Sequence, residues 1–313
     1  QVAGSITLSE GSITFSSLTD TTRVEATVLD AQGATLVGAS VTWTSSDPSV
    51  ATVDSAGLVT AVNDGSADVT ASSGSAQSVA PIMVSQAAAS VVLSADTLEF
   101  VSLGDTATVG VTVLDAAGQP ITGASVTWTS SDGSVASVSV SGLLTSLTNG
   151  ASTITATSGT ASATATVAVA QVTSTVALDA DTVAFASLGD TLRLTATVSD
   201  ANDAVISGAS VTWASSDVAV ATVDADGLVT SVTNGSATIT ATSGTASATA
   251  EVEVTQVAAT ITLSSIDLTL ALVGDTSTVT ATVLDALGET ISGATVMWAS
   301  SDTAVATVSV TGL

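Results

Sequence analysis

The sequence has no cysteine, lysine, histidine or tyrosine, and its only basic residues are Arg23 and Arg193. Without cysteine no disulfide can staple the fold, and without lysine no Lys–Asn isopeptide bond can cross-link it. Histidine, cysteine and lysine are also the usual bases that activate a serine nucleophile, so an ordinary hydrolytic triad is excluded. Any mechanical strength must come from packing, strand pairing, bound ions or contacts between chains.

Acidic residues number 28, and the net charge is −26. Such a chain repels the phosphates of nucleic acids and the anionic surface of membranes. No apolar run approaches the roughly 20 residues that a membrane helix needs. The sequence therefore predicts no nucleic-acid partner and no membrane insertion in this segment. Because it begins at Gln1 rather than methionine, we expect a processed chain or a fragment.

Tryptophan recurs every 85 residues, at Trp43, Trp128, Trp213 and Trp298. This period predicts four domains without insertion or deletion, at residues 1–85, 86–170, 171–255 and 256–313. The fourth repeat stops about 27 residues short and lacks about two C-terminal strands. Either the chain continues beyond Leu313, or another chain supplies the missing strands by β-augmentation.

Apolar residues alternate with a period of two, which is typical of strands with one buried face. In residues 22–28, for example, valine or alanine occupies every second position, and polar or charged residues stand between them. Turn residues separate the strands predicted in the first repeat, which are residues 4–8, 12–16, 21–29, 38–45, 49–53, 57–62, 66–72 and 76–85. Asn63-Asp64-Gly65 reads as a tight hairpin turn. Many short strands at this spacing predict a β-sandwich.

One ordered motif recurs in every repeat. In the first repeat it runs Val-Thr-Trp-Thr-Ser-Ser-Asp-Pro-Ser-Val-Ala-Thr-Val over residues 41–53, and continues through Gly-Leu-Val-Thr-Ala-Val at 57–62. It resembles the group 2 bacterial immunoglobulin-like domain. That resemblance implies a spacer and presentation module without catalytic residues, as found in intimin- and invasin-type adhesins, other surface proteins and some phage structural proteins.

The tryptophans are predicted to be structural core residues, because a buried indole contributes a large apolar area. Sugar stacking on an exposed indole is the alternative. Three aspartate positions also recur in each repeat, and we expect them to hold turns by accepting backbone N–H bonds. They are Asp20, Asp105, Asp190 and Asp275; Asp30, Asp115, Asp200 and Asp285; and Asp47, Asp132, Asp217 and Asp302.

A structural Ca²⁺ ion is the alternative role for acidic residues, because Ca²⁺ takes several oxygen ligands. The candidate ligands lie in the third repeat and are Asp179, Asp181, Asp224 and Asp226. Paired carboxylates could also hydrolyse glycosides. Recurring aspartates would then imply an identical active site in every repeat, so we expect no enzyme and no cofactor beyond this ion.

Together these features predict an all-β chain of tandem immunoglobulin-like sandwiches arranged as an elongated rod. Gln86, Gln171 and Gln256 mark short, stiff junctions. The predicted function is a non-catalytic spacer in an extracellular bacterial surface fibre or adhesin. Expected partners are neighbouring repeats, copies of the same chain, and a host or surface receptor contacted through regions outside this segment. The alternatives are a subunit of a self-assembling extracellular filament or sheath, or a phage virion fibre or decoration protein.

Overall fold

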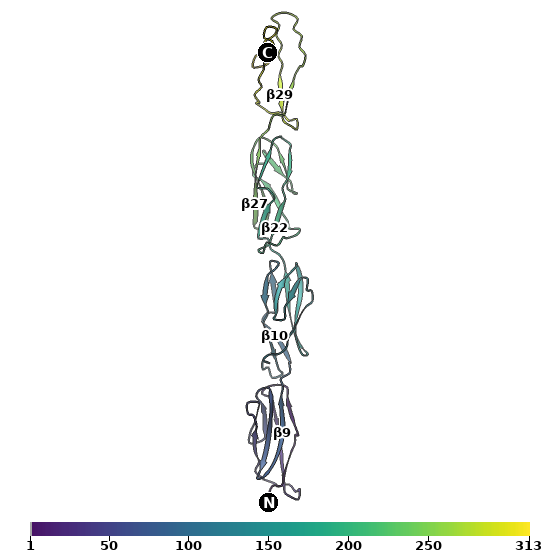
Figure 1. Ribbon diagram of the computed structural model, residues 1–313, viewed down its shortest axis with the longest axis vertical. Helices are drawn as coiled ribbons and strands as arrows, with labels where there is room; N and C mark the ends of the chain where they lie inside the picture. Colours follow the sequence, from purple (N-terminus) through teal and green to yellow (C-terminus); the bar gives the residue numbers. More distant parts are fainter. Residues whose placement is uncertain (1) are drawn as a thin grey trace. The chain divides into compact units, whose positions relative to one another are not determined.

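The computed structural model describes residues 2–313, which form strands and turns (Figure 1). None of these residues forms a helix, and so none forms a helix that could cross a membrane. The chain divides into two compact units, Gln1–Ala170 and Gln171–Leu313. The predicted all-β class and the repeated sandwich are confirmed.

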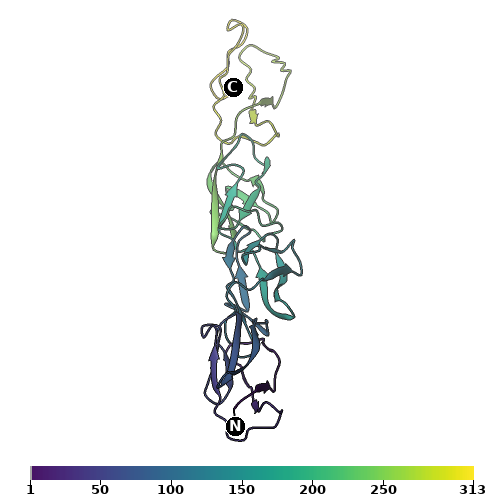
Figure 2. The same cartoon turned by 60° about the horizontal axis from the view of Figure 1, so that its bottom comes forward.

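The first repeat contains nine strands: β1 (Ser5–Leu8), β2 (Ile13–Phe15), β3 (Thr21–Arg23), β4 (Ala26–Leu29), β5 (Thr42–Ser45), β6 (Ala51–Val53), β7 (Leu58–Ala61), β8 (Gly65–Ser73) and β9 (Ala76–Val84). They form a four-stranded sheet in the order β2-β9-β8-β5, a three-stranded sheet β3-β7-β6, and the pair β1-β4. Only β2 and β9 run parallel in this repeat. The long hairpin β8–β9 is seen from a second side in Figure 2.

The second and third repeats reproduce this order of strands and sheets. The strands of the second are β10 (Ser90–Leu93), β11 (Thr97–Phe100), β12 (Thr106–Thr108), β13 (Val111–Leu114), β14 (Thr127–Ser130), β15 (Ala136–Val138), β16 (Leu143–Ser146), β17 (Gly150–Ser158) and β18 (Ala161–Val169). Those of the third are β19 (Thr175–Leu178), β20 (Thr182–Phe185), β21 (Thr191–Arg193), β22 (Ala196–Ser199), β23 (Thr212–Ser215), β24 (Ala221–Val223), β25 (Leu228–Ser231), β26 (Gly235–Ser243) and β27 (Ala246–Val254).

Each core lies between the sheets and depends on the long hairpin. In β8 and β9 the inward positions are small or β-branched, and most of them are buried, among them Val69, Ala80 and Ile82. The residues between them face outward and are polar or half-exposed. Burial contributes about 25 cal/mol for each Å² of apolar surface removed from water, so this hairpin is a main source of stability in the repeat.

Two details differ from the prediction. Residues 21–29 are not one strand, because β3 pairs with β7 whereas β4 pairs with β1. The change of sheet occurs at Val24, whose amide donates to the carbonyl of Gly57 at 2.8 Å. Such corners are common where a strand passes from one sheet of a sandwich to the other.

The predicted hairpin turn at residues 63–65 is also wrong. The strands on its two sides do not pair with each other: β7 pairs with β3 and β6, and β8 pairs with β5 and β9. The segment is therefore a crossing between sheets. Gly65 has a φ of 146°, and a Cβ there would lie 2.8 Å from Cγ2 of Val50, so the close approach requires glycine.

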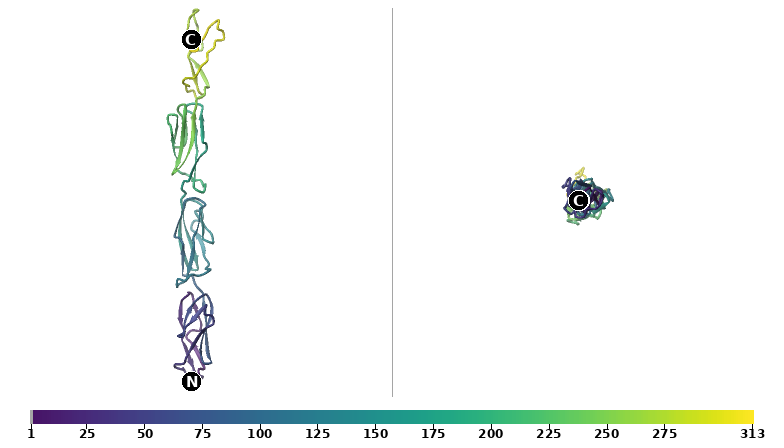
Figure 3. Two further views of the ribbon diagram at one scale, coloured as in Figure 1. Left: turned by 90° about the vertical axis from the view of Figure 1, so that its left-hand side faces the viewer. Right: turned by 90° about the horizontal axis from the view of Figure 1, so that it is seen from below.

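Residues 256–313 contain only two strands, β28 (Thr260–Leu263) and β29 (Ala281–Leu284). Figure 3 shows this part of the chain in yellow, drawn mostly as loop. Its apolar face is open: Val305 is 83% exposed, whereas the equivalent Val220 is 9% exposed. The difference arises because Val220 lies in a repeat that has the hairpin β26–β27, and residues 256–313 have no such hairpin.

Gly142 of the second repeat lies against Val109, where the chain passes from one sheet to the other, and it allows a test of this close approach. Its φ is +78°, and a Cβ would lie 2.5 Å from the Val109 carbonyl oxygen and 3.0 Å from the Trp128 ring. We expect Gly142→Ala to lower the melting temperature of this repeat by about 8 °C or more in calorimetry, since left-handed strain and the clash cost about 2 kcal/mol together.

Gly133→Ala is the matched control in the same repeat, because nothing would lie within 4 Å of a Cβ at that position and its φ is not left-handed. We expect a change within about 0.5 kcal/mol. Equal melting temperatures for the two variants would show that the corner does not require glycine.

Candidate functional site

The most specific cluster of polar side chains lies where one repeat joins the next. Between β9 and β10 the chain passes through residues 85–89, and its backbone amides are bonded on both sides. Ser85 and Ala87 donate to the carbonyls of Phe15 and Ser16 in the first repeat, each at 2.9 Å. Ala89 donates to the Leu114 carbonyl in the second repeat at 2.8 Å. The connection is thus part of both domains and is not a free linker.

Gln86 lies at the centre of this connection. Its backbone amide donates to Oδ1 of Asp64, in the first repeat, at 2.7 Å. Its side-chain Nε2 donates to Oδ2 of Asp115, in the second repeat, at 2.9 Å. One glutamine therefore bonds to carboxylates of both neighbouring domains.

Asp115 is the acceptor of the junction bonds in the second repeat. Its Oδ1 accepts the amides of Ala117 at 3.0 Å and Gln119 at 2.8 Å, which fixes the turn after β13. Its Oδ2 accepts Gln86 and also the backbone amide of Leu18, in the first repeat, at 2.8 Å. The side chain is buried, so its four bonds replace water completely. We call Leu18, Asp64, Gln86 and Asp115 the first junction cluster.

The same arrangement joins the third and fourth repeats. The amide of Gln256 donates to Oδ1 of Asn234 at 2.8 Å, and Gln256 Nε2 donates to Oδ2 of Asp285 at 2.9 Å. Asp285 also accepts the amide of Leu188 at 3.0 Å. Because Asn234 replaces aspartate, its Nδ2 can donate a further bond to Gln256 Oε1 at 3.1 Å. We call Leu188, Asn234, Gln256 and Asp285 the second junction cluster.

Asp30 occupies the equivalent turn of the first repeat. Its Oδ1 accepts the amides of Gln32 at 3.0 Å and Ala34 at 2.9 Å. Both donors belong to the turn itself, and both bond the same carboxylate oxygen. The turn therefore leaves the second carboxylate oxygen of this position available to a junction.

These bonds act on the acidity of the junction carboxylates. Burial alone would raise the pKa of Asp285, but hydrogen bonds from Gln256, Leu188 and the turn amides prevail and lower it to about 2. The pKa of Asp115 is lowered for the same reasons, with burial opposing the bonds from Gln86, Gln119 and Leu18. Both groups are ionised at neutral pH, when their charge-assisted hydrogen bonds are strongest.

The other recurring aspartates lie at turns. Asp47, Asp132 and Asp302 each accept, through Oδ1, the amide two residues later at 2.9–3.0 Å. Asp275 accepts the amide of Leu272 at 2.8 Å, and Asp190 that of Thr191 at 2.8 Å. These local bonds are the kind expected of aspartate beside a turn.

The proposed calcium ligands also engage backbone amides. Asp224 accepts the amides of Asp226 and Leu228 at 2.8 and 2.9 Å, and Asp179 accepts that of Thr195 at 2.9 Å. In the described range 2–313, neither these residues nor Asp181 belong to a group of three acidic side chains able to hold a metal.

The tryptophans are half-buried. Trp43 packs against both apolar clusters of the first repeat, and Trp128 does so in the second. Trp213 packs against the core of the third repeat, whereas Trp298 lies in the open fourth repeat. The indole thus spans the middle of the sandwich. In each repeat one edge of the ring lies beside a glycine, which is Gly57, Gly142, Gly227 or Gly312.

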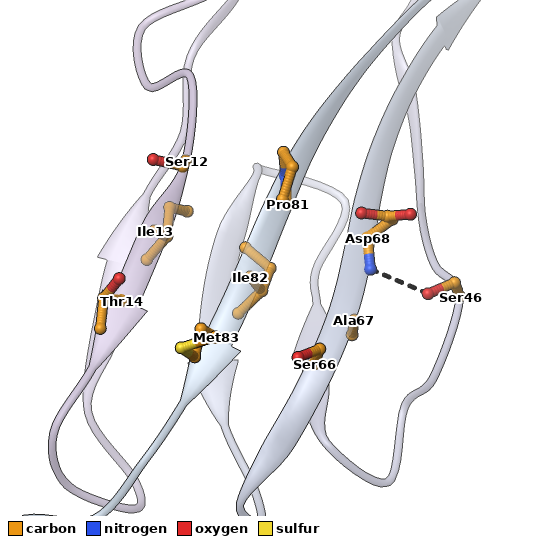
Figure 4. Close-up of a pocket in the computed structure, with 10 residues that line it drawn as sticks. All are labelled: Ser12, Ile13, Thr14, Ser46, Ser66, Ala67, Asp68, Pro81, Ile82 and Met83. Carbon is orange, nitrogen blue, oxygen red and sulfur yellow. Dashed lines mark hydrogen bonds between the residues drawn. The ribbon is translucent and has the colours of Figure 1, made fainter.

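A shallow groove crosses the outer face of the sheet of the first repeat (Figure 4). Its rim carries hydroxyl and apolar side chains from β2, β8 and β9, among them Thr14, Ser66 and Met83. Asp68 is the only charged residue of the groove, and its backbone amide donates to Ser46 Oγ at 2.8 Å. With one carboxylate and no second acid or base, the groove offers no pair for acid–base catalysis.

The sequence model of the family described as bacterial Ig-like domain (group 2) matches residues 13–84, 78–169 and 172–254. The chain belongs to this family. The match confirms the resemblance seen in the tryptophan motif, and it places a bacterial Ig-like domain in each of the first three repeats. The sequence matches no curated protein.

Several solved structures resemble this array of bacterial Ig-like domains. Invasin, described as a bacterial integrin-binding protein, is 20% identical with a TM-score of 0.43, over 83% of this chain and 61% of its own. The Escherichia coli adhesin FdeC is 20% identical with a TM-score of 0.33, over 81% and 99%. Domains 1–6 of the surface layer protein SbsC are 22% identical with a TM-score of 0.30, over 93% and 44%. The chain thus spans less than half of that SbsC structure.

Asp115→Asn should loosen the first junction. An asparagine oriented to hold the turn through its carbonyl presents its NH₂ group to the donors of Leu18 and Gln86, so both bonds across the junction are lost. Because the chain has no cysteine, spin labels can be attached uniquely at Thr27→Cys and Thr112→Cys. We expect the distribution of distances between the labels to broaden.

Asp30→Asn is the control, since it changes the same turn in the first repeat without a junction bond in the described chain. Its label distances should keep the width of the parent chain. An unchanged distribution in Asp115→Asn would show that the carboxylate does not hold the domains together.

Acid should open the second junction. The pKa of Asp285 is lowered to about 2 in the folded chain, from an ordinary value of about 4. Its contribution is therefore complete above pH about 4 and lost as the pH falls toward 2. We expect labels at Thr197→Cys and Thr282→Cys to show a broadening distance distribution over that window. Asp285→Asn should give a broad distribution at every pH, and a pH response retained in that variant would assign the transition to another group.

Proposed function

We propose that this chain is a stiff, non-catalytic spacer in an extracellular bacterial surface protein of the adhesin type. The observation that carries the proposal is the bonded junction, repeated with the same geometry at Gln86 and Gln256. A spacer must resist bending between its domains, and each junction ties a connecting segment to both neighbours. Cysteine, histidine and lysine, which would activate a serine nucleophile, are absent from the composition.

The charge of the chain supports the same proposal. A net charge of −26 keeps neighbouring chains apart and suppresses nonspecific adhesion along the spacer. Binding to a host or surface receptor would then be confined to other regions of the protein. The membership in the bacterial Ig-like family supports a location at the cell surface or outside the cell.

A subunit of an extracellular filament or sheath is the second candidate function. It is favoured by the open apolar face of residues 256–313, where Leu270 is 46% and Val305 is 83% exposed, whereas the equivalent Phe185 and Val220 are 5% and 9% exposed. In the first three repeats the long hairpin covers the equivalent side of the sandwich. A hairpin of that type, from this chain or another, is the element that fits the open face.

Removal of residues 86–170 tests the spacer directly. This deletion joins Ser85 to Gln171 and keeps the 85-residue period, so a junction of the same composition forms from Leu18, Asp64, Gln171 and Asp200. We expect a monomer whose maximum dimension in small-angle scattering is smaller by roughly 35 to 45 Å, the length of one sandwich. A longer deletion, of residues 86–175, is the control: it removes the junction glutamine and should give a broad, flexible particle.

Sedimentation of the same samples distinguishes the two functions. Monomers at all concentrations support the spacer. Polymers that lengthen with concentration would overturn it in favour of the filament subunit.

A further inference from the structure

The second junction cluster contains an Asn–Gly bond, which is a chemically reactive sequence. Asn234 is followed by Gly235, and both residues are exposed. Asparagine followed by glycine is the sequence in which the next backbone nitrogen most easily reaches the side-chain carbon, because glycine has no Cβ to obstruct it. The same side chain bonds Gln256 through both of its polar atoms.

The fold prevents a protective change at the glycine. Gly235 has a φ of +147°, and a Cβ there would lie 3.0 Å from Cγ2 of Val220. Gly65 and Gly150 have the same conformation and face Val50 and Val135 in the same way. Position 235 must therefore remain glycine, whichever residue at position 234 bonds the junction glutamine.

We propose that Asn234 is a site of spontaneous deamidation, and that the closed junction restrains the reaction. The Gly235 nitrogen loses its proton and attacks Cγ of Asn234, forming a C–N bond; the C–NH₂ bond breaks and ammonia leaves. Water then opens the resulting succinimide at one of its two carbonyls. Attack at one carbonyl gives aspartate, and attack at the other gives isoaspartate, in which the main chain runs through the side-chain carbon.

The junction restrains the first step by holding the side chain. Asn234 Oδ1 accepts the Gln256 amide at 2.8 Å, and Nδ2 donates to Gln256 Oε1 at 3.1 Å. Gln256 is itself fixed by Asp285 at 2.9 Å. Rotation of the amide toward Gly235 requires both bonds to Gln256 to break, so the reaction proceeds from the opened junction.

The first repeat shows what the aspartate product does. Asp64 occupies the equivalent position, and its Oδ1 accepts the Gln86 amide at 2.7 Å. Aspartate at position 234 can therefore keep the main bond while it loses the donor to Gln256 Oε1 and gains a charge. Isoaspartate cannot keep it, because the extra main-chain carbon displaces the carboxylate. Deamidation thus divides the population into chains with a closed junction and chains with a weakened one.

The experiment uses the full chain with Asn149→Asp, which leaves Asn234–Gly235 as the only Asn–Gly bond. The protein is incubated at mildly alkaline pH, and products at position 234 are measured by peptide mass spectrometry and enzymatic methylation of isoaspartate. We expect both aspartate and isoaspartate to accumulate. Gln256→Ala removes the side-chain acceptor and the bond to Asp285, and it should accelerate the reaction several-fold. Gln86→Ala makes the same change at the first junction and should leave the rate unchanged.

Two outcomes would overturn the proposal. If position 234 stays intact while a free peptide of residues 229–240 deamidates under the same conditions, the folded chain does not permit the reaction. If Gln256→Ala and Gln86→Ala react at the same rate, the junction does not restrain it. Neither outcome depends on whether the chain acts as a spacer.

Discussion

The connection between neighbouring repeats depends on a carboxylate that accepts hydrogen bonds from two domains at once. One oxygen of Asp115 or Asp285 holds the turn of its own repeat, and the other accepts the leucine amide of the repeat before it. Burial of such a group is costly unless every bond is made. The bonds to Leu18 or Leu188 and to the junction glutamine therefore form as a set. Together with the backbone bonds of the connecting segment, they tie one repeat to the next within each described unit.

The sequence predicted the fold well because the alternation of apolar and polar residues that determines it recurs in every repeat. Alternating valine, alanine and threonine in an 85-residue period allow only strands with one buried face. The tryptophan motif then indicated the family. The same alternation could not show that residues 21–29 change sheets at Val24, since both halves of that segment bury the same face and only the partner strand differs.

The junction clusters were predicted only in part. The recurring glutamines and aspartates were visible as a period, and the aspartates were assigned to turns, a role that the bonds of Asp115 include. The second role of Asp115, the bond across the junction, could not be predicted, because its partner is the backbone amide of Leu18 and a backbone amide has no signature in the sequence. Asp64 and Asn234 were assigned to a hairpin turn. Each precedes a glycine and lies 22 residues before a junction glutamine, and this recurring spacing is the signal that could have indicated their bond to that glutamine.

The two arginines have a consequence for resistance to proteolysis. Trypsin-like proteases require a lysine or arginine side chain in their specificity pocket. Arg23 and Arg193 are the only such residues in 313, and each lies on a strand paired with its neighbour, β3 on β7 and β21 on β25. Both guanidinium groups also donate to a turn carbonyl, Ala56 or Asp226. Cleavage would require local unfolding at one of two places, so the scarcity of basic residues makes the folded array a poor substrate for trypsin-like proteases.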